Sequence, residues 1–134
     1  KDYMKLTVKT CRQQGFVTNI FGRRIHLRGI NDKNFSVRAF QERAAINAPI
    51  QGSAADIIRL AMIKIDKILE KKKKAKMLLQ IHDELIFECL KKDETEVKKI
   101  VKDAMTSVSS SEHHMFSIPL EVSISSGNNW GEAH

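Results

Sequence analysis

Two short apolar segments separated by three polar residues constrain the fold of this chain more than any other feature. Residues 77–81 and 85–90 have the composition of β-strands, and only His82, Asp83 and Glu84 lie between them. This pattern predicts a tight antiparallel hairpin. Such turns usually contain Asn-Gly or Asp-Gly, which adopt positive φ at little cost, whereas this turn has no glycine and two adjacent carboxylates. Because adjacent carboxylates repel each other, the composition of the turn indicates a functional role.

A divalent cation would relieve the repulsion between Asp83 and Glu84. Carboxylate oxygens on a short, stiff turn suit Mg²⁺, which typically binds one or two protein carboxylates together with substrate phosphates. Two such ions about 3.5–4 Å apart can activate an attacking hydroxyl and neutralise a leaving pyrophosphate. The alternative is an exposed polar turn without a ligand, since short acidic turns are common. For His82 the alternative is a turn histidine whose partners are backbone groups.

The first part of the chain predicts a helix and a second hairpin. Residues 2–14 have apolar side chains at helical spacing and are followed by Gly15, which favours a helix stop. Residues 16–20 and 24–27 are short β-type segments on either side of a turn, and residues 29–34 are rich in turn formers.

Residues 36–70 predict a long helical region with a break near its middle. Pro49 lacks a backbone donor and, together with Gly52, favours a kink or a helix end. Ser53 and Asp56 are three residues apart and match the capping-box pattern at the start of a second helix. Beyond this start, seven apolar positions predict a buried stripe: Ile57, Ile58, Ala61, Met62, Ile65, Ile68 and Leu69.

The last third of the chain predicts an amphipathic helix and a final strand. Within residues 93–108, six apolar side chains share one helical face: Val97, Ile100, Val101, Ala104, Met105 and Val108. A serine-rich loop with His113 and His114 follows, and residues 120–125 alternate apolar and polar side chains as a strand does. Strands separated by helices indicate an α+β fold with a sheet covered on one face.

The net charge of +7 and the pI near 9.5 indicate an acidic partner, and nucleic acid is the commonest one. Lys71 to Lys74 and Lys76 form a lysine run, although such a run is often a solvated loop. Cys11 and Cys89 lack CxxC partners, which argues against a disulfide framework or a zinc site. The sequence has no apolar run that predicts a membrane partner and no signal peptide. It does not begin with methionine, so we expect it to be part of a longer protein.

Three ordered blocks resemble family A DNA polymerases of the bacterial DNA polymerase I type. Gln80-Ile81-His82-Asp83-Glu84-Leu85 is similar to motif C of that family. Gly22-Arg23-Arg24 and residues 42–56 are similar to a second block, and residues 127–134 are similar to the family's C-terminus. Because the blocks occur in the family's order and cover nearly the whole chain, residues 1–134 resemble the C-terminal part of a polymerase domain.

The resemblance implies a palm-subdomain fragment with a central antiparallel β-hairpin, a small sheet and packed helices. Asp83 would then be a catalytic carboxylate and a Mg²⁺ ligand, and Glu84 an accessory catalytic acid. His82 would contact DNA near the primer 3′ end. The resemblance also implies a two-metal site that is completed by an aspartate from an upstream palm strand outside this chain.

The resemblance also assigns primer–template and minor-groove contacts to Arg43, Asn47 and Gln51. Their spacing agrees with this role, because residues four apart in a helix lie on one face and drift by only about 40° per step. All three side chains donate hydrogen bonds, and the minor groove presents purine N3 and pyrimidine O2 acceptors. The alternative is a solvated polar helix face. Arg23 and Arg24 are expected to contact phosphates or a neighbouring part of the enzyme, with surface ion pairs as the alternative.

For the parent protein, the resemblance implies template-directed DNA synthesis in replication and repair, by Mg²⁺-dependent nucleotidyl transfer from a dNTP to a primer 3′-hydroxyl with release of pyrophosphate. The partners would be primer–template DNA, a dNTP and the remainder of the parent chain. The expected location is the bacterial cytoplasm, at the nucleoid, with an organelle or a nucleus as alternatives. The upstream palm strand, most of the fingers, the thumb and the exonuclease regions lie outside these residues, so we expect the isolated fragment to be inactive.

Two other functions agree with part of the pattern. A non-enzymatic basic module could bind duplex DNA through Arg43, Asn47, Gln51 and the lysine run, but it leaves the acidic hairpin unexplained, because acids repel phosphates unless a cation intervenes. A small metal-dependent nuclease centred on His82, Asp83 and Glu84 would need further ligands from this chain.

Overall fold

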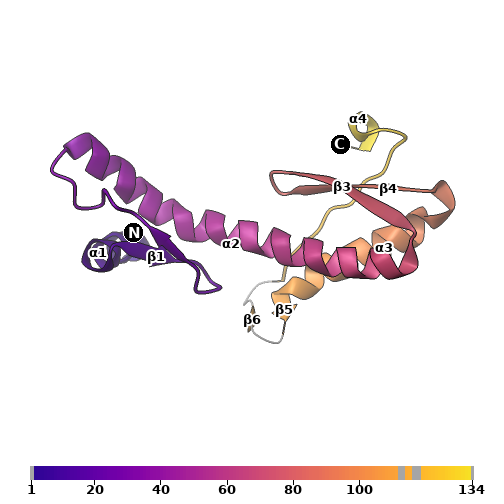
Figure 1. Ribbon diagram of the computed structural model, residues 1–134, viewed down its shortest axis with the longest axis horizontal. Coiled ribbons are helices and arrows are strands. Elements are labelled where there is room, and N and C mark those ends of the chain that lie inside the picture. The colour runs from indigo at the N-terminus through magenta and orange to yellow at the C-terminus, as the bar shows by residue number, and fades with distance from the viewer. Residues whose placement is uncertain (1, 112–113, 116–118, 134) are drawn as a thin grey trace. The chain divides into compact units, whose positions relative to one another are not determined.

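The computed structural model describes residues 2–111, 114–115 and 119–133 (Figure 1). The chain divides into two compact units, Lys1–Asp56 and Ile57–His134. Helix α2, Phe35–Lys72, contributes its first part to one unit and its remainder to the other. None of the helices in the described ranges combines the length and the apolar character needed to cross a membrane.

The first unit begins with helix α1, Asp2–Gln14, and a short antiparallel hairpin of β1, Phe16–Thr18, and β2, Arg24–His26. Gly15 ends α1 as predicted, because it adopts a φ of +80° and its N–H donates to the Cys11 carbonyl at 2.7 Å. The core of this unit consists of one buried cluster: Cys11, Val17, Leu27, Ile30 and Ala45. The predicted helix and second hairpin are therefore confirmed.

Helix α2 begins where Asn34 caps it. The Asn34 side chain accepts a hydrogen bond from the Ser36 N–H at 2.9 Å, which satisfies one of the free donors of the first turn. The predicted helix end near Pro49 is wrong, since α2 is helical through this residue. The predicted capping box is also wrong: the Ser53 hydroxyl donates to the Pro49 carbonyl at 2.6 Å inside the helix. Proline removes one helical hydrogen bond, and packing of Ala45 and Ser53 on either side maintains the helix.

The second unit contains the long hairpin of β3, Ala75–Ile81, and β4, Glu84–Cys89, which is visible in Figure 1. A short 3₁₀ turn, Lys91–Asp93, leads into helix α3, Glu94–Thr106. The remaining elements are short: η2, Ser107–Ser109; β5, Ser110–Ser111; β6, His114–Met115; and α4, Trp130–Ala133. Among the described residues, the helices and small antiparallel sheets confirm the predicted α+β class, and each sheet is two-stranded.

The core of the second unit confirms both predicted helical stripes. It consists of five buried side chains from α2 and α3: Ile65, Leu69, Val97, Val101 and Ala104. Ile68, Ile100 and Met105 are partly buried and pack against it, together with Leu85 and Phe87 of the hairpin. The β3–β4 hairpin is therefore held against α2 and α3 by apolar contacts, which fix the base of its turn.

The predicted final strand is wrong, although its burial pattern is present. Residues 119–128 form no strand in the described structure, yet Leu120, Val122 and Ile124 are partly buried and the residues between them are exposed. Ile124 packs against the core of the second unit. A strand also needs a neighbouring edge for its hydrogen bonds, which an alternating sequence cannot supply. His113, predicted as a loop residue, lies outside the described residues, and His114 lies in β6.

Candidate functional site

The acidic hairpin turn consists of two residues, His82 and Asp83. Ile81 pairs with Glu84, so Glu84 is the first residue of β4 rather than part of the turn. The Gln80 side chain donates to the His82 carbonyl at 3.0 Å and closes the turn. His82 has a φ of 52°, a conformation in which histidine is enriched among non-glycine residues. The sequence therefore predicted the hairpin, and the positive φ that glycine usually supplies falls on the histidine.

The turn presents its polar side chains to solvent. His82 and Asp83 are exposed, and Glu84 is half-buried beside them at the start of β4. Because the strands behind the turn pack against the core through Leu85 and Phe87, the two carboxylates sit on a supported tip. A ligand can approach Asp83 directly.

A bulge in β3, close to the turn, was not predicted. The pairing register shifts between Met77 and Leu79, so Leu78 is the extra residue. Both leucines are exposed, by 53% and 44%, whereas a regular strand would bury one of two neighbours. In the sequence, the only indication of the bulge was the pair of adjacent leucines, Leu78 and Leu79, which interrupts the alternation of apolar and polar residues in the strand. Bulges bend a strand and redirect side chains, and they are frequent beside active sites.

The donor chemistry of the tip fits a hard divalent cation, but the donor set is incomplete. Asp83 and Glu84 supply carboxylate oxygens, the ligand type that Mg²⁺ prefers. Across residues 2–111, 114–115 and 119–133, no three side chains of His, Cys, Asp or Glu are grouped to hold a metal. A complete site on this hairpin therefore requires ligands from elsewhere.

Arg43, Asn47 and Gln51 occupy one exposed face of α2 in the first unit. Each is exposed, whereas Gly52 and Ser53 immediately after Gln51 are buried. The structure thus places the three predicted DNA-contacting residues together on α2, and His82, Asp83 and Glu84 together in the second unit. The two groups lie in different units.

Sequence patterns missed the contacts that support α2 beside Gln51. Arg23 Nε forms an ion pair with Asp56 at 2.8 Å, which was the alternative given for this residue, and its contact with phosphates stays a prediction. Arg24 instead lies 4.7 Å above the Phe16 ring. The only indication of this ion pair in the sequence was that Arg23 and Asp56 both lie in the blocks that resemble the polymerase family.

Part of the lysine run is occupied by ion pairs. Lys72 contacts Glu96 at 2.8 Å, and Lys74 contacts both Glu96 and Asp93. Hydrogen bonds from Lys72 and Lys74 lower the pKa of Glu96 to about 2, and the bond to Glu96 raises the pKa of Lys74. The run therefore ties the end of α2 to α3, and it is neither a purely solvated loop nor five free cations.

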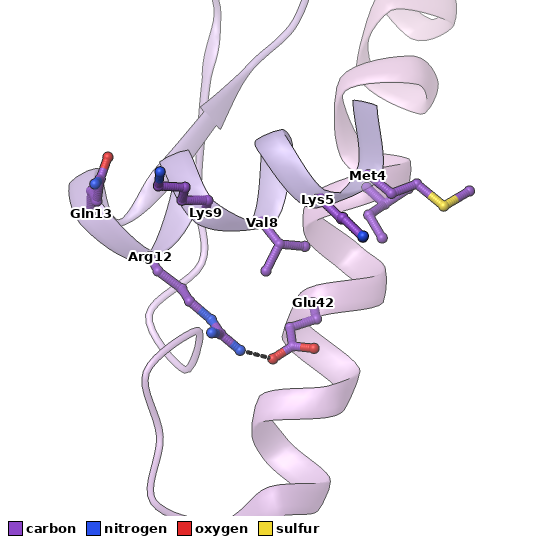
Figure 2. A pocket seen from close by; sticks show the side chains of 8 residues that line it. Met4, Lys5, Val8, Lys9, Arg12, Gln13 and Glu42 are labelled. Carbon is purple, nitrogen blue, oxygen red and sulfur yellow. Dashed lines mark hydrogen bonds and ion pairs between the residues drawn. The ribbon is translucent and has the colours of Figure 1, made fainter. Parts of the chain in front are cut away.

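A shallow hollow of about 510 Å³ lies between α1 and α2 in the first unit. Figure 2 shows Val8 of α1 pointing toward α2 and the Arg12 side chain reaching Glu42, with which it forms an ion pair. None of the six predicted site residues lines this hollow. It is consequently separate from the candidate site.

Comparisons with known proteins agree with the blocks found in the sequence. Residues 1–132 match the family described as DNA polymerase family A. DNA polymerase I of Rhizobium leguminosarum is 47% identical over 137 residues, which cover 100% of this chain and 13% of that protein. DNA polymerase I of Streptococcus pneumoniae serotype 4 is 46% identical over 99% of this chain and 15% of its own length. The chain thus spans well under a fifth of the curated relatives that it matches.

A solved structure shares the fold as well. The POL domain of Pol1 from M. smegmatis, in complex with DNA primer-template and dNTP, matches with a TM-score of 0.90 and 39% sequence identity. The match covers 98% of this chain and 23% of that chain. The family model matches residues 1–132 of this chain, and two relatives are 46% and 47% identical to it. This chain therefore belongs to DNA polymerase family A.

Proposed function

We propose that the protein of which this chain is part synthesises DNA on a template, adding a dNTP to a primer 3′-hydroxyl with release of pyrophosphate. The observation that carries the proposal is the similarity of 98% of the chain to a polymerase domain solved with DNA primer-template and dNTP. The comparisons give no support to a non-enzymatic DNA-binding module or a small nuclease. In this proposal the chain is the C-terminal part of the polymerase domain, and the upstream palm strand, most of the fingers, the thumb and the exonuclease regions belong to the rest of the parent.

Asp83 is proposed as the catalytic carboxylate that binds a divalent metal, with Glu84 as the accessory acid. Membership of the family implies such a metal, and we propose Mg²⁺ in a two-metal site completed by an aspartate from the rest of the parent. When bound, the metal supplies activation of the primer hydroxyl and neutralisation of the pyrophosphate charge. The exposure of Asp83 and the support of the hairpin by the core favour this assignment. His82, next to Asp83, is proposed to contact the primer end.

Arg43, Asn47 and Gln51 are proposed to contact primer–template DNA from the exposed face of α2. Every base pair presents hydrogen-bond acceptors in its minor groove, at purine N3 and pyrimidine O2. Donors on one helix face can therefore test the geometry of a base pair without reading its sequence. The exposure of all three side chains supports this role, because they are free to approach a duplex.

Primer extension by the parent polymerase carrying Asp83→Ala tests the proposed catalytic role. We expect extension to fall by at least about 10³-fold while binding of primer–template is retained, because positioning and charge stabilisation provide most of phosphoryl-transfer catalysis. Glu88→Ala is the matched control, since Glu88 is an exposed acid on the same hairpin in β4. Normal extension by Asp83→Ala would mean that the turn is structural, and the proposed catalytic role of Asp83 would be wrong.

A further inference from the structure

The loop that joins β1 to β2 is closed by the side chain of Asn19. This residue is only 6% exposed, and its Oδ1 accepts hydrogen bonds from the N–H groups of Phe21 and Arg23, at 3.0 and 2.9 Å. The Gly22 N–H donates to the Asn19 carbonyl at 3.0 Å, with Gly22 at a φ of 76°. The loop is therefore a small rigid element.

This loop is attached to one turn of α2 by side-chain hydrogen bonds. Asn19 Nδ2 donates to the carboxylate of Asp56 and, at 3.3 Å, to the carbonyl of Gly52. Arg23 binds the same two groups, with Nε at 2.8 Å from Asp56 and Nη2 at 3.3 Å from the Gly52 carbonyl. Asn19 thus uses both amide donors on α2 while both loop N–H groups use its oxygen, so its hydrogen-bonding capacity is filled.

Two further contacts bring the loop close to α2. The Ile20 N–H donates to Ser53 Oγ at 3.1 Å, and Ser53 in turn donates to the Pro49 carbonyl. A Cβ at Gly52 would lie 3.0 Å from Ile25 Cδ1, which is tighter than ordinary van der Waals contact. Gly52 therefore allows the hairpin to approach the helix at this turn.

The hairpin contacts the side of α2 opposite the proposed DNA-contacting face. At about 100° per residue, Asp56 lies roughly 140° to 180° around the helix from Arg43, Asn47 and Gln51. Burial agrees, since Gly52 is buried and the three polar residues are exposed. The hairpin leaves the polar face open while it holds the helix from behind.

The turn of α2 just before the one that receives these contacts lacks a helical hydrogen bond. Pro49 lies between Asn47 and Gln51 and cannot donate a helical hydrogen bond. Bending or rotation at this point would change the position of Gln51 relative to Asn47. The attachments at Gly52, Ser53 and Asp56 restrain both movements.

We propose that Asn19, Arg23 and Asp56 are positioning residues that fix Gln51 in register with Asn47 and Arg43 on α2. The inference rests on the proposed contact between this face and DNA, and it assigns to the β1–β2 loop an effect on how strictly the enzyme tests the terminal base pair. A purely structural loop would affect the thermal stability of the protein and leave discrimination between paired and mispaired primer ends unchanged.

The test is a double-mutant cycle in the full parent polymerase, with Arg23→Ala, Gln51→Ala and both together. The readout is the ratio of kcat/KM for extending a matched and a mismatched primer end. We expect Gln51→Ala to lower this ratio and Arg23→Ala to lower it by about three- to tenfold, with the double variant no worse than Gln51→Ala alone, because contacting groups in one network are not additive. A primer-terminal purine in which carbon replaces N3 lacks the minor-groove acceptor. This replacement should lower kcat/KM for extension by a larger factor in the wild type than in the Arg23→Ala variant.

Conservative and control variants separate positioning from folding. Arg23→Lys retains a charge for Asp56 but cannot reach Asp56 and the Gly52 carbonyl in the same way, so we expect partial rescue. Arg28→Ala removes the same charge from an exposed position outside the network and should leave the ratio unchanged. If Arg23→Ala fails to fold, Arg23→Lys and Asp56→Asn give the same comparison with less disruption.

The possible failures are distinguishable. If Gln51→Ala lowers discrimination while Arg23→Ala and Asp56→Asn change only the melting temperature, the loop is structural and this inference is overturned. Additive losses in the double variant would overturn it as well, since Arg23 would then act independently of Gln51. If Gln51→Ala itself has no effect on discrimination, the proposed DNA contact of α2 fails, and the positioning role fails with it.

Discussion

Lys73 and His82 are the two non-glycine residues with positive φ among the residues that the structure describes, at 51° and 52°. Lys73 follows the last turn of α2, and its N–H donates to the Leu69 carbonyl at 2.7 Å, the position usually taken by glycine in a helix C-cap. His82 occupies the first position of the β3–β4 turn. In both places a residue with a Cβ adopts a backbone conformation that favours glycine. Of the two, only His82 has a proposed function.

Replacing Lys73 with glycine should therefore stabilise the protein. The left-handed conformation is unfavourable for a residue with a Cβ by about 1 kcal/mol or more, and glycine adopts it freely. We expect Lys73→Gly to raise the midpoint of thermal unfolding of the parent protein. Lys71→Gly is the matched control, because it places glycine inside the last helical turn and should lower the midpoint. A lower midpoint for Lys73→Gly would contradict the assigned cap.

At the scale of elements, local patterns predicted the hairpin at residues 77–90, the apolar face of α3 and the end of α1 at Gly15, because these depend on spacing along the chain. Two predictions were wrong because tertiary contacts decide them. Packing around Pro49 keeps α2 continuous, and residues 120–125 have the burial of a strand without a pairing edge.

The same distinction applies to the candidate site. The acidic turn could be located from the sequence, because its residues are neighbours in the chain. The attachment of Asn19 to Asp56 joins residues 37 positions apart, which no local spacing can indicate. The unpaired Leu78 of the bulge was visible only as an interruption of the alternation in β3.

The ion pairs between the end of α2 and α3 should make the stability of the second unit depend on pH, with a loss at low pH. Hydrogen bonds from Lys72 and Lys74 lower the pKa of Glu96 from 4.5 to about 2. Since the folded pKa is depressed, this stabilisation is fully present above pH about 4.5 and is lost as the pH falls towards 2. We expect Glu96→Gln to be less stable than the wild type near pH 6 and the difference to disappear near pH 2.

Thermal unfolding of the wild type and of Glu96→Gln between pH 2 and pH 7 measures the difference in stability between them. The same difference measured at 1 M salt provides the control. Glu96 and its lysine partners are partly exposed, so salt should reduce the contribution. A difference that stays constant across this pH range would show that Glu96 contributes through packing rather than through its charge.

At the scale of the whole molecule, the positive charge is distributed unequally between the two units. Residues 1–56 contain ten lysines and arginines against four acids, whereas residues 57–134 contain thirteen against twelve. The positive charge of the lysine run is therefore offset by acids of its own unit, and the excess lies in the unit that carries Arg43, Asn47 and Gln51. The acidic turn lies in the nearly neutral unit, where the attraction of phosphate is weakest without a metal.

This distribution leads to a prediction for the 134-residue chain purified by itself. We expect it to bind duplex DNA weakly, with an affinity that falls steeply between about 50 and 200 mM salt, because backbone phosphates are bound with release of counterions. We also expect no template-directed synthesis, since the carboxylates of the tip do not complete a metal site among the described residues and catalysis depends on positioning the dNTP. Primer extension, DNA binding and circular dichroism on one preparation test this, with the parent polymerase as the positive control. Primer extension by a folded, DNA-binding preparation of the fragment would show that these residues contain a sufficient active site, and the proposed dependence on an aspartate from the rest of the parent would be wrong.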